Sequence, residues 1–174
     1  ATALVTLNEM AGTNLGTEEL MRMGARLGAD VPFFIFGRTA LASGIGDRLE
    51  AVDGIPRIWF VLVNPGFEIS TREVYESLRL GLTGDSIQYT MPRLTTVSRV
   101  AEELYNDLER VSLPLYPALS EIKERLIASG ASGSLMSGSG STVFGVFESE
   151  DDARKAEGKL REARIGSVFV ASSI

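Results

Sequence analysis

The sequence contains neither cysteine nor histidine. Without cysteine the chain has no disulfide bond and no thiolate chemistry, which fits a reducing compartment, and we expect a cytoplasmic protein. Without histidine, a serine–histidine relay, a histidine general base and a histidine-ligated metal are all excluded. If the chain takes part in catalysis, its acid–base chemistry must therefore use carboxylates, lysine or tyrosine.

The chain also lacks long hydrophobic runs and basic clusters. No apolar run reaches the roughly 18 residues that cross a bilayer, and the N-terminus lacks the basic region of a secretory signal. Lys and Arg never occur in runs longer than a pair, and the formal net charge is −6. A nucleic-acid-binding protein usually has a basic face. We therefore expect neither a membrane nor a nucleic acid as partner.

Length and composition are those of a globular protein. The 174 residues are 44% hydrophobic, enough for one large domain or two small ones. The chain begins with Ala, in what reads as the middle of a helix, so either the initiator Met was removed or the chain is truncated. Residues 1–57 do not make a domain by themselves, which favours truncation.

Residues 1–57 read as part of an N-terminal domain. A first helix covers residues 2–10 and ends near Gly12, and a second helix has Thr17 as its N-cap. The segments that follow are apolar, short and separated by glycine, which predicts a small antiparallel sheet with a turn at 44–46. Its strands are expected at residues 31–37, 38–44 and 47–52.

Residues 58–174 predict a second domain with an order of elements typical of a ferredoxin-like, split βαβ fold. A buried strand and a helix come first, then two extra helices as an insertion, and then β-β-α-β. The fold class is therefore α+β. The expected elements are a strand at 58–66, a helix from 70, a looser region at 83–96, helices at 98–111 and 118–130, strands at 132–137 and 141–147, a helix at 150–166 and a strand at 166–173.

Asp30 lies at the start of an almost unbroken apolar run, LGADVPFFIFG. A carboxylate is costly to bury unless it is paired, hydrogen-bonded or protonated. One interpretation is that Asp30 caps a turn between two elements. The other is that it serves as a general base, with Phe33 and Phe34 as a low-dielectric wall that raises its proton affinity. The residues alone leave both open.

A second candidate site is the Gly/Ser turn, which we define as Ser137, Gly138, Ser139, Gly140 and Ser141. It joins two expected strands, so a flexible hairpin turn is one interpretation. The other is a backbone N–H cradle for an anion or nucleotide, where glycine allows close approach. The turn is not a Walker loop, since no Gly-Lys-Ser/Thr follows. It does not open a helix after a strand, so a dinucleotide fold is disfavoured.

Six sequence motifs follow one another along the chain in this order: LGADVPFF, ASGIGDRLEAV, NPG, STREVY, YNDLE and GASGSLMSGSGSTVFGVF. In this order they resemble the GHMP kinase superfamily over essentially the whole chain. The resemblance implies an N-terminal domain like the second domain of ribosomal protein S5, of which residues 1–57 are a remnant. It also implies a ferredoxin-like C-terminal domain at residues 58–174.

The resemblance further implies an ATP- and Mg²⁺-dependent small-molecule kinase. In the branch that the chain most resembles, the substrate is the 2-hydroxyl of 4-diphosphocytidyl-2-C-methyl-D-erythritol, an intermediate of non-mevalonate isoprenoid biosynthesis. Asp30 takes the catalytic position, where it orients or deprotonates this hydroxyl. Thr71 and Tyr75 line the substrate pocket, where the Tyr75 ring could stack on the cytidine or could instead pack inward. The Gly/Ser turn supports the nucleotide loop, and YNDLE receives no chemical role.

The chain departs from the family pattern at its N-terminal side. The family's catalytic lysine and its phosphate-binding loop do not occur in these residues, so we expect this stretch alone to be a poor kinase. We also expect self-association through apolar surface on residues 1–57. The alternatives are another GHMP kinase, acting on homoserine, mevalonate or a sugar, and a non-catalytic ferredoxin-like module that binds a ligand.

Overall fold

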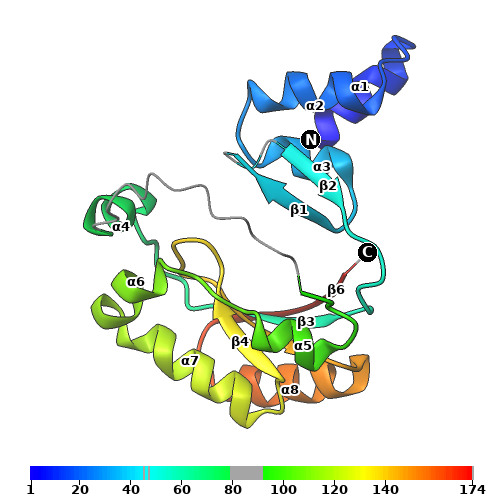
Figure 1. The fold of residues 1–174 in the computed structure, drawn as a ribbon. Helices are drawn as coiled ribbons and strands as arrows, with labels where there is room; N and C mark the ends of the chain where they lie inside the picture. The colour runs from blue at the N-terminus through cyan, green and yellow to red at the C-terminus, as the bar shows by residue number, and fades with distance from the viewer. Residues whose placement is uncertain (45, 47, 79–91, 174) are drawn as a thin grey trace. The chain divides into compact units, whose positions relative to one another are not determined.

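The computed structural model describes residues 1–44, 46, 48–78 and 92–173. The chain forms two compact units, Ala1–Gly54 and Ile55–Ser173 (Figure 1). One residue of the expected turn at 44–46, and the expected loose region up to residue 91, lie outside the described residues. Each unit is considered by itself below.

The first unit contains three helices and a two-stranded sheet. The helices are α1 (Thr2–Ala11), α2 (Thr17–Ala25) and α3 (Val31–Phe36), and the strands are β1 (Ala40–Ser43) and β2 (Arg48–Ala51). Both expected helices are present, and α1 ends at Gly12 in the left-handed conformation. The N-cap of α2 is Gly16 rather than Thr17. The strands β1 and β2 pair antiparallel, as expected for residues 38–52.

The predicted strand at residues 31–37 was wrong, because this segment forms α3. Pro32 lies in the first turn of that helix, where its missing N–H costs nothing. Val31 and Ile35, one helical turn apart, pack on α2 at Gly24, where an added Cβ would lie 2.8 Å and 2.9 Å from their side chains. The apolar run showed no helical period, because nearly every position in it is apolar.

The second unit is a four-stranded antiparallel sheet with strand order β4-β5-β3-β6. Because β5 lies antiparallel between β3 and β4, those two strands run parallel, as in a split βαβ unit. The predicted α+β, ferredoxin-like plan is therefore confirmed. Its elements are β3 (Trp59–Asn64), α4 (Thr71–Ser77), α5 (Val97–Glu102), α6 (Glu109–Leu115), α7 (Pro117–Ala128), β4 (Gly133–Met136), β5 (Val143–Phe147), α8 (Glu150–Glu162) and β6 (Ser167–Ser172).

Hydrophobic side chains pack on both faces of this sheet. On one face α7 and α8 lie side by side (Figure 1) and bury Val61 and Val63 completely. The adjacent strand position, Phe60, belongs to a smaller cluster together with Val97 of α5. Since successive strand residues point to opposite faces, α5 covers the other face. The segment before α6 is therefore held against the sheet at the β4 and β5 side.

The expected single helix at 98–111 is also corrected. The structure has α5 and α6 with a break between Glu103 and Leu108. In the break, the Asn106 Oδ1 accepts the Leu108 N–H at 3.0 Å. This Asn turn competes with the helix, as Asn side chains commonly do when they bond to nearby backbone.

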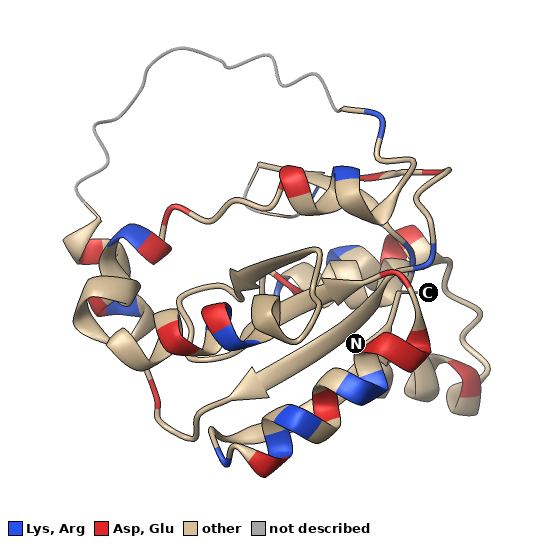
Figure 2. Cartoon of the chain, turned by 90° about the horizontal axis from the view of Figure 1, so that it is seen from below, with Lys and Arg blue, Asp and Glu red and all other residues tan. Residues whose placement is uncertain are grey.

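Acidic and basic residues are interspersed along several of the helices (Figure 2). In α8 the acidic residues Glu150, Asp151 and Asp152 occupy the first turn, and Lys159 and Arg161 the last, which complements the helix dipole as expected. Ser149 caps this helix by accepting the Asp152 N–H. The Ser149 hydroxyl also donates to the Asp152 carboxylate, and together with Lys155 it lowers the pKa of Asp152.

We predict that Ser149→Ala lowers the free energy of unfolding by about 1 kcal/mol, because the α8 cap is lost. The pKa of Asp152 should rise toward its ordinary value, since the hydrogen bond that lowers it is gone. Urea denaturation and NMR titration measure the two effects. Ser98→Ala, an exposed serine within α5, is the control. An unchanged unfolding free energy for Ser149→Ala would contradict the capping role.

Candidate functional site

The Gly/Ser turn joins β4 to β5 in the second unit. Two of its residues require glycine: Gly138 has a φ of 55°, and Gly140 has a φ of 95°. A Cβ at Gly140 would lie 3.0 Å from both the Ile69 and the Met136 side chains. The turn therefore connects two antiparallel strands, as the hairpin interpretation expects, with a backbone conformation that favours glycine at two positions.

Side chains from the segment between α5 and α6, and from α6 itself, hold the carbonyl groups of the turn. Asn106 Nδ2 donates to the carbonyl oxygens of Met136 and Gly138, both at 2.8 Å. The fully buried Ser112 donates from Oγ to the carbonyl oxygen of Ser139 at 3.0 Å. These three bonds hold the carbonyl group of Met136, directly before the turn, and those of Gly138 and Ser139 within it.

A partly buried ion pair supports the same segment. Glu109 on α6 bonds to Lys123 on α7, and their side chains are 16% and 23% exposed. Glu109 Oε1 also accepts the Met136 N–H at 2.8 Å. The charge pair thus links two helices to the last residue of β4, directly before the turn.

The turn is also tied to the segment that follows β3. Thr71, the first residue of α4, shares a hydrogen bond of 2.8 Å between its Oγ1 and the Ser139 Oγ. The Ser141 hydroxyl donates to the carbonyl oxygen of Phe67, and both Ser139 and Ser141 are buried. Thr71 and the turn therefore form one contiguous cluster, which the sequence predictions had treated as two separate features.

Within the turn, the backbone N–H groups divide into used and unused donors. Ser137 N–H donates to the Thr142 carbonyl and Gly140 N–H donates to the Ser137 carbonyl, each at 2.9 Å. In the described part of the chain, the N–H groups of Gly138, Ser139 and Ser141 donate to no acceptor. Gly138 and Ser139 thus offer two adjacent N–H groups for an anion.

Asp30 belongs to the first unit, where it precedes α3 as its N-cap residue without a side-chain capping bond. Its side chain is exposed, and Phe33 and Phe34 are 39% and 69% exposed. In the first unit, Phe33 and Phe34 therefore do not form the low-dielectric wall that we expected around the Asp30 carboxylate. The reason is that α3 turns these two phenylalanines outward, while Val31 and Ile35 face α2. The catalytic role of Asp30 stays a prediction.

Tyr75 lies on α4 and is 58% exposed. The interpretation that this ring packs inward is wrong; the inward position of α4 is taken by Val74, which is 2% exposed. Tyr75 thus leaves an aromatic surface available one helical turn after Thr71. A role in substrate binding stays a prediction.

Three residues of this cluster were missed from the sequence: Asn106, Glu109 and Ser112. Asn106 and Glu109 belong to YNDLE, to which no chemical role was given. The one usable signal was an Asn inside an otherwise helical pattern, because Asn disfavours helix interiors and bonds to nearby backbone. Its neighbour Tyr105 is exposed and donates to Asp107, and this bond and the Asp107 charge raise the pKa of Tyr105.

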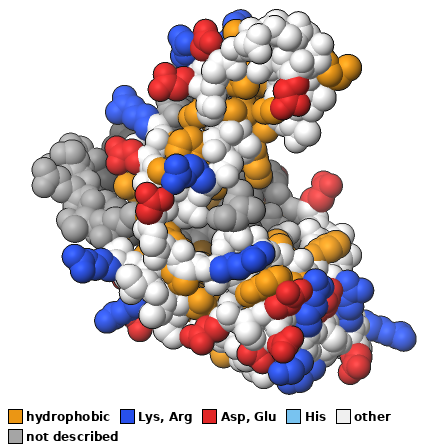
Figure 3. Space-filling view, turned by 90° about the vertical axis from the view of Figure 1, so that its right-hand side faces the viewer, with side chains coloured by type: hydrophobic (Ala, Val, Ile, Leu, Met, Phe, Trp, Pro, Cys, Tyr) orange, Lys and Arg blue, Asp and Glu red, His pale blue; other side chains and the backbone are white. Residues whose placement is uncertain are grey.

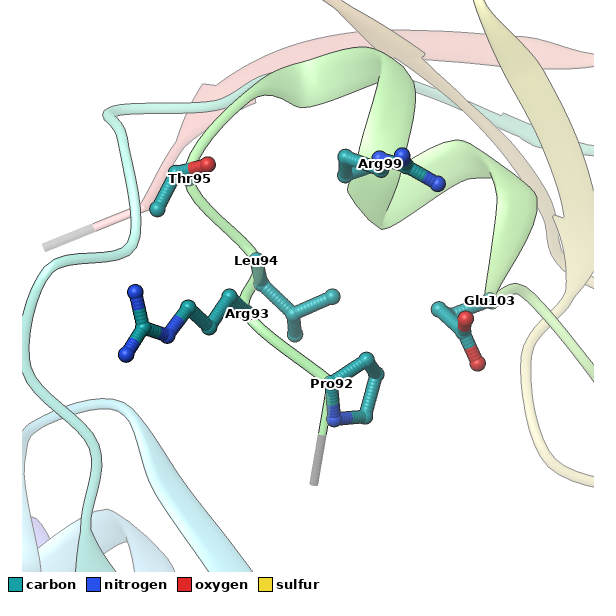
Figure 4. Close-up of a pocket in the computed structure, with 6 residues that line it drawn as sticks. All are labelled: Pro92, Arg93, Leu94, Thr95, Arg99 and Glu103. Atoms are coloured by element: carbon teal, nitrogen blue, oxygen red, sulfur yellow. The ribbon is translucent and has the colours of Figure 1, made fainter. Parts of the chain in front are cut away.

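A shallow pocket of about 340 Å³ lies beside α5 in the second unit (Figure 4). Arg99 and Glu103 come from α5 and its C-cap, and Pro92, Arg93, Leu94 and Thr95 come from the segment that leads into it. None of the predicted site residues line this pocket. Arg99 is already paired with Glu102 at 2.8 Å.

The described residues contain no group of three Asp, Glu, His or Cys side chains placed to hold a metal ion. No helix in the described ranges is both long and apolar enough to cross a bilayer.

Comparison with known protein families gives a match for part of the second unit. Residues 91–165 match the family described as GHMP kinases C terminal. Those residues include the turn and the side chains that hold it. Residues 91–165 belong to the GHMP kinase C-terminal family.

Relatives of this GHMP kinase domain match the chain over nearly all of its length. A 4-diphosphocytidyl-2-C-methyl-D-erythritol kinase of Syntrophus aciditrophicus is 53% identical over 174 residues, which are 100% of this chain and 62% of the relative. The enzyme of the same name from Geobacter metallireducens is 55% identical over 157 residues, 90% of this chain and 55% of the relative. The chain thus spans about six tenths of the length of the curated relatives that it matches.

Solved structures agree with this assignment. A crystal structure of 4-(cytidine 5'-diphospho)-2C-methyl-D-erythritol kinase matches with a TM-score of 0.76 and 33% identity, covering 97% of this chain and 60% of the other. A homoserine kinase from Cytophaga hutchinsonii has a TM-score of 0.68 at 19% identity, covering 97% of this chain and 61% of the other. At that identity the homoserine kinase shows the fold alone.

We predict that Glu109→Ala lowers the free energy of unfolding of the GHMP kinase domain by about 2 kcal/mol, because Lys123 and the Met136 N–H both lose their partner. Glu109→Gln should cost less, since the amide oxygen can still accept from Met136. Urea denaturation measures both. Glu121→Ala, which breaks an exposed pair with Arg125 on α7, is the control and should change little. Equal effects at Glu109 and Glu121 would contradict this account.

Proposed function

We propose that this protein is a small-molecule kinase that uses ATP to phosphorylate the 2-hydroxyl of 4-diphosphocytidyl-2-C-methyl-D-erythritol. The observation that carries the proposal is the 53% identity, over the whole chain, to a relative with the name of that kinase. The anchored Gly/Ser turn supports it, because a phosphate-transferring enzyme needs rigid N–H donors for phosphate oxygens.

The Gly/Ser turn is proposed as the support for the nucleotide phosphates. The N–H groups of Gly138 and Ser139 have no acceptor in the described part of the chain, and Gly138 has no side chain that could block a phosphate oxygen. ATP, when bound, supplies the phosphoryl group that is transferred. We propose that Mg²⁺ takes its ligands mainly from the nucleotide phosphates and water, since the described residues contain no cluster of ligands.

Asp30 is proposed as the residue that orients the substrate hydroxyl and accepts its proton. The hydroxyl oxygen then forms the new bond to the γ-phosphorus, while the bond from that phosphorus to the ADP oxygen breaks. An exposed carboxylate in the first unit is free of competing ion pairs among the described residues, so it can accept a proton from a bound substrate.

We predict that Asp30→Asn in the full-length protein lowers kcat by about 10²- to 10⁴-fold, because the amide cannot accept the hydroxyl proton. The affinity for ATP should stay nearly unchanged. Steady-state kinetics and calorimetry measure the two quantities. Asp53→Asn, which removes an exposed carboxylate that pairs with Arg38, is the matched control and should keep its activity. Near-normal turnover in Asp30→Asn would exclude the role.

Substrate choice separates this proposal from its rivals. Offered 4-diphosphocytidyl-2-C-methyl-D-erythritol, homoserine and mevalonate together, the full-length protein should consume the first, and homoserine or mevalonate use would refute the proposal.

Tyr75→Ala should raise KM for the cytidine substrate severalfold, with KM for ATP unchanged, since a stacking surface is lost. Tyr75→Phe keeps the ring and is the control. A non-catalytic module would bind a ligand and turn over none of the three.

Two further assignments remain proposals. A cytoplasmic location rests on the absence of cysteine. Self-association rests on apolar side chains exposed on the first unit, where Met10, Leu27 and Phe34 are 79%, 71% and 69% exposed. Hydrophobic side chains are visible at the surface in Figure 3. Sedimentation velocity reports the oligomeric state directly, and a monomer at all concentrations would exclude self-association.

A further inference from the structure

We infer that Asn106 is a positioning residue that aims the Ser139 N–H at a phosphate oxygen of the bound nucleotide. The inference rests on the proposed kinase function and adds a residue to it, from the segment between α5 and α6. It follows from three observations: the bonds that Asn106 makes, the geometry of one peptide group, and the absence of another acceptor for that group in the described chain.

Every hydrogen-bonding group of the Asn106 side chain is engaged. Its Nδ2 donates to the Met136 and Gly138 carbonyl oxygens at 2.8 Å each, and its Oδ1 accepts the Leu108 N–H at 3.0 Å. An amide has two N–H donors and one carbonyl, so this side chain is fixed in orientation as well as in place. No other common side chain of this size offers two donors and an acceptor in that arrangement.

The bond to Gly138 controls one particular N–H group. In a trans peptide the carbonyl and the following N–H share a plane and point in opposite directions. Holding the Gly138 carbonyl toward Asn106 therefore turns the Ser139 N–H the opposite way. In the described part of the chain this N–H has no acceptor, so it is available to a phosphate oxygen of a bound nucleotide.

The hydrogen bonds to the Met136 and Ser139 carbonyl groups have a different consequence, because the N–H groups that follow them already have acceptors. Asn106 also holds the Met136 carbonyl, and the following Ser137 N–H already donates to Thr142. Ser112 holds the Ser139 carbonyl, and the following Gly140 N–H already donates to Ser137. Only the Asn106–Gly138 bond thus directs a donor that the turn itself does not use. Ser112 is therefore the matched comparison for Asn106.

The test uses the full-length protein with Asn106→Asp. Aspartate keeps the shape and can still accept the Leu108 N–H, but it loses both donors and places a charge against two carbonyl oxygens. We expect ATP to bind about tenfold to a hundredfold more weakly, as for loss of a hydrogen bond to a charged group. The KM for the second substrate should stay the same. Calorimetry with ATP measures the first effect without turnover.

Two variants separate aiming from general support of the fold. Ser112→Ala should lower thermal stability but weaken ATP binding clearly less than Asn106→Asp does, because the N–H that follows the Ser139 carbonyl already donates within the turn. Asn8→Asp is a control in the first unit, where Asn8 makes a similar set of bonds to Leu15. Should Asn106→Asp fail to fold, Asn106→Ser keeps a cap for Leu108 with a side chain too short for both carbonyls, and the same loss is expected.

The outcomes are distinct. A loss of ATP affinity that is clearly larger in Asn106→Asp than in Ser112→Ala supports the inference. Unchanged ATP binding in Asn106→Asp, or an equal loss in both variants, overturns it, because the turn is then only held in place. A wild-type protein that binds ATP but phosphorylates none of the three candidate substrates would refute the proposed function. The role of Asn106 would still be decided by the ATP affinities of the variants.

Discussion

The shape of the Gly/Ser turn depends on side chains that hold its carbonyl groups. A run of glycine and serine has no intrinsic preference for one conformation, and glycine loses much entropy when it is ordered. Asn106, Ser112 and the Glu109–Lys123 pair supply the bonds that offset this cost. Because carbonyl and N–H directions are coupled through the planar peptide, fixing the Gly138 carbonyl also fixes the direction of the Ser139 N–H.

The sheet gives these bonds a rigid frame. The register of β5 against β3 and of β4 against β5 places the turn at one end of the strands, and α7 packs across both strands below it. Gly145 in β5 lets that helix approach, since a Cβ there would lie 2.9 Å from Ala131 and 3.1 Å from Leu126. The Glu109–Lys123 pair then fastens α6 to α7. The position of the turn is therefore set by the packing of α6 and α7 on the sheet.

Elements with a clear period were predictable from the sequence. Leu119, Ile122 and Leu126 recur at helical spacing in the sequence, and all three are at most 2% exposed on α7. The acidic first turn and the basic last turn of α8 likewise favour a helix. Two segments failed for opposite reasons. Residues 31–37 are so uniformly apolar that no period could be seen, and 98–111 has a helical period that Asn106 interrupts through contacts far away in the sequence.

The sequence by itself determined the α+β class, the order of elements in the second unit, the position of the Gly/Ser turn and the residue types that allow phosphate chemistry without histidine or cysteine. Those properties depend on local spacing and composition. Only the tertiary structure decided that Thr71 bonds to Ser139, that Tyr75 faces outward, and that Asn106 and Ser112 hold the turn. These contacts join residues 27 to 68 positions apart, and no local pattern records which distant carbonyl a side chain will meet.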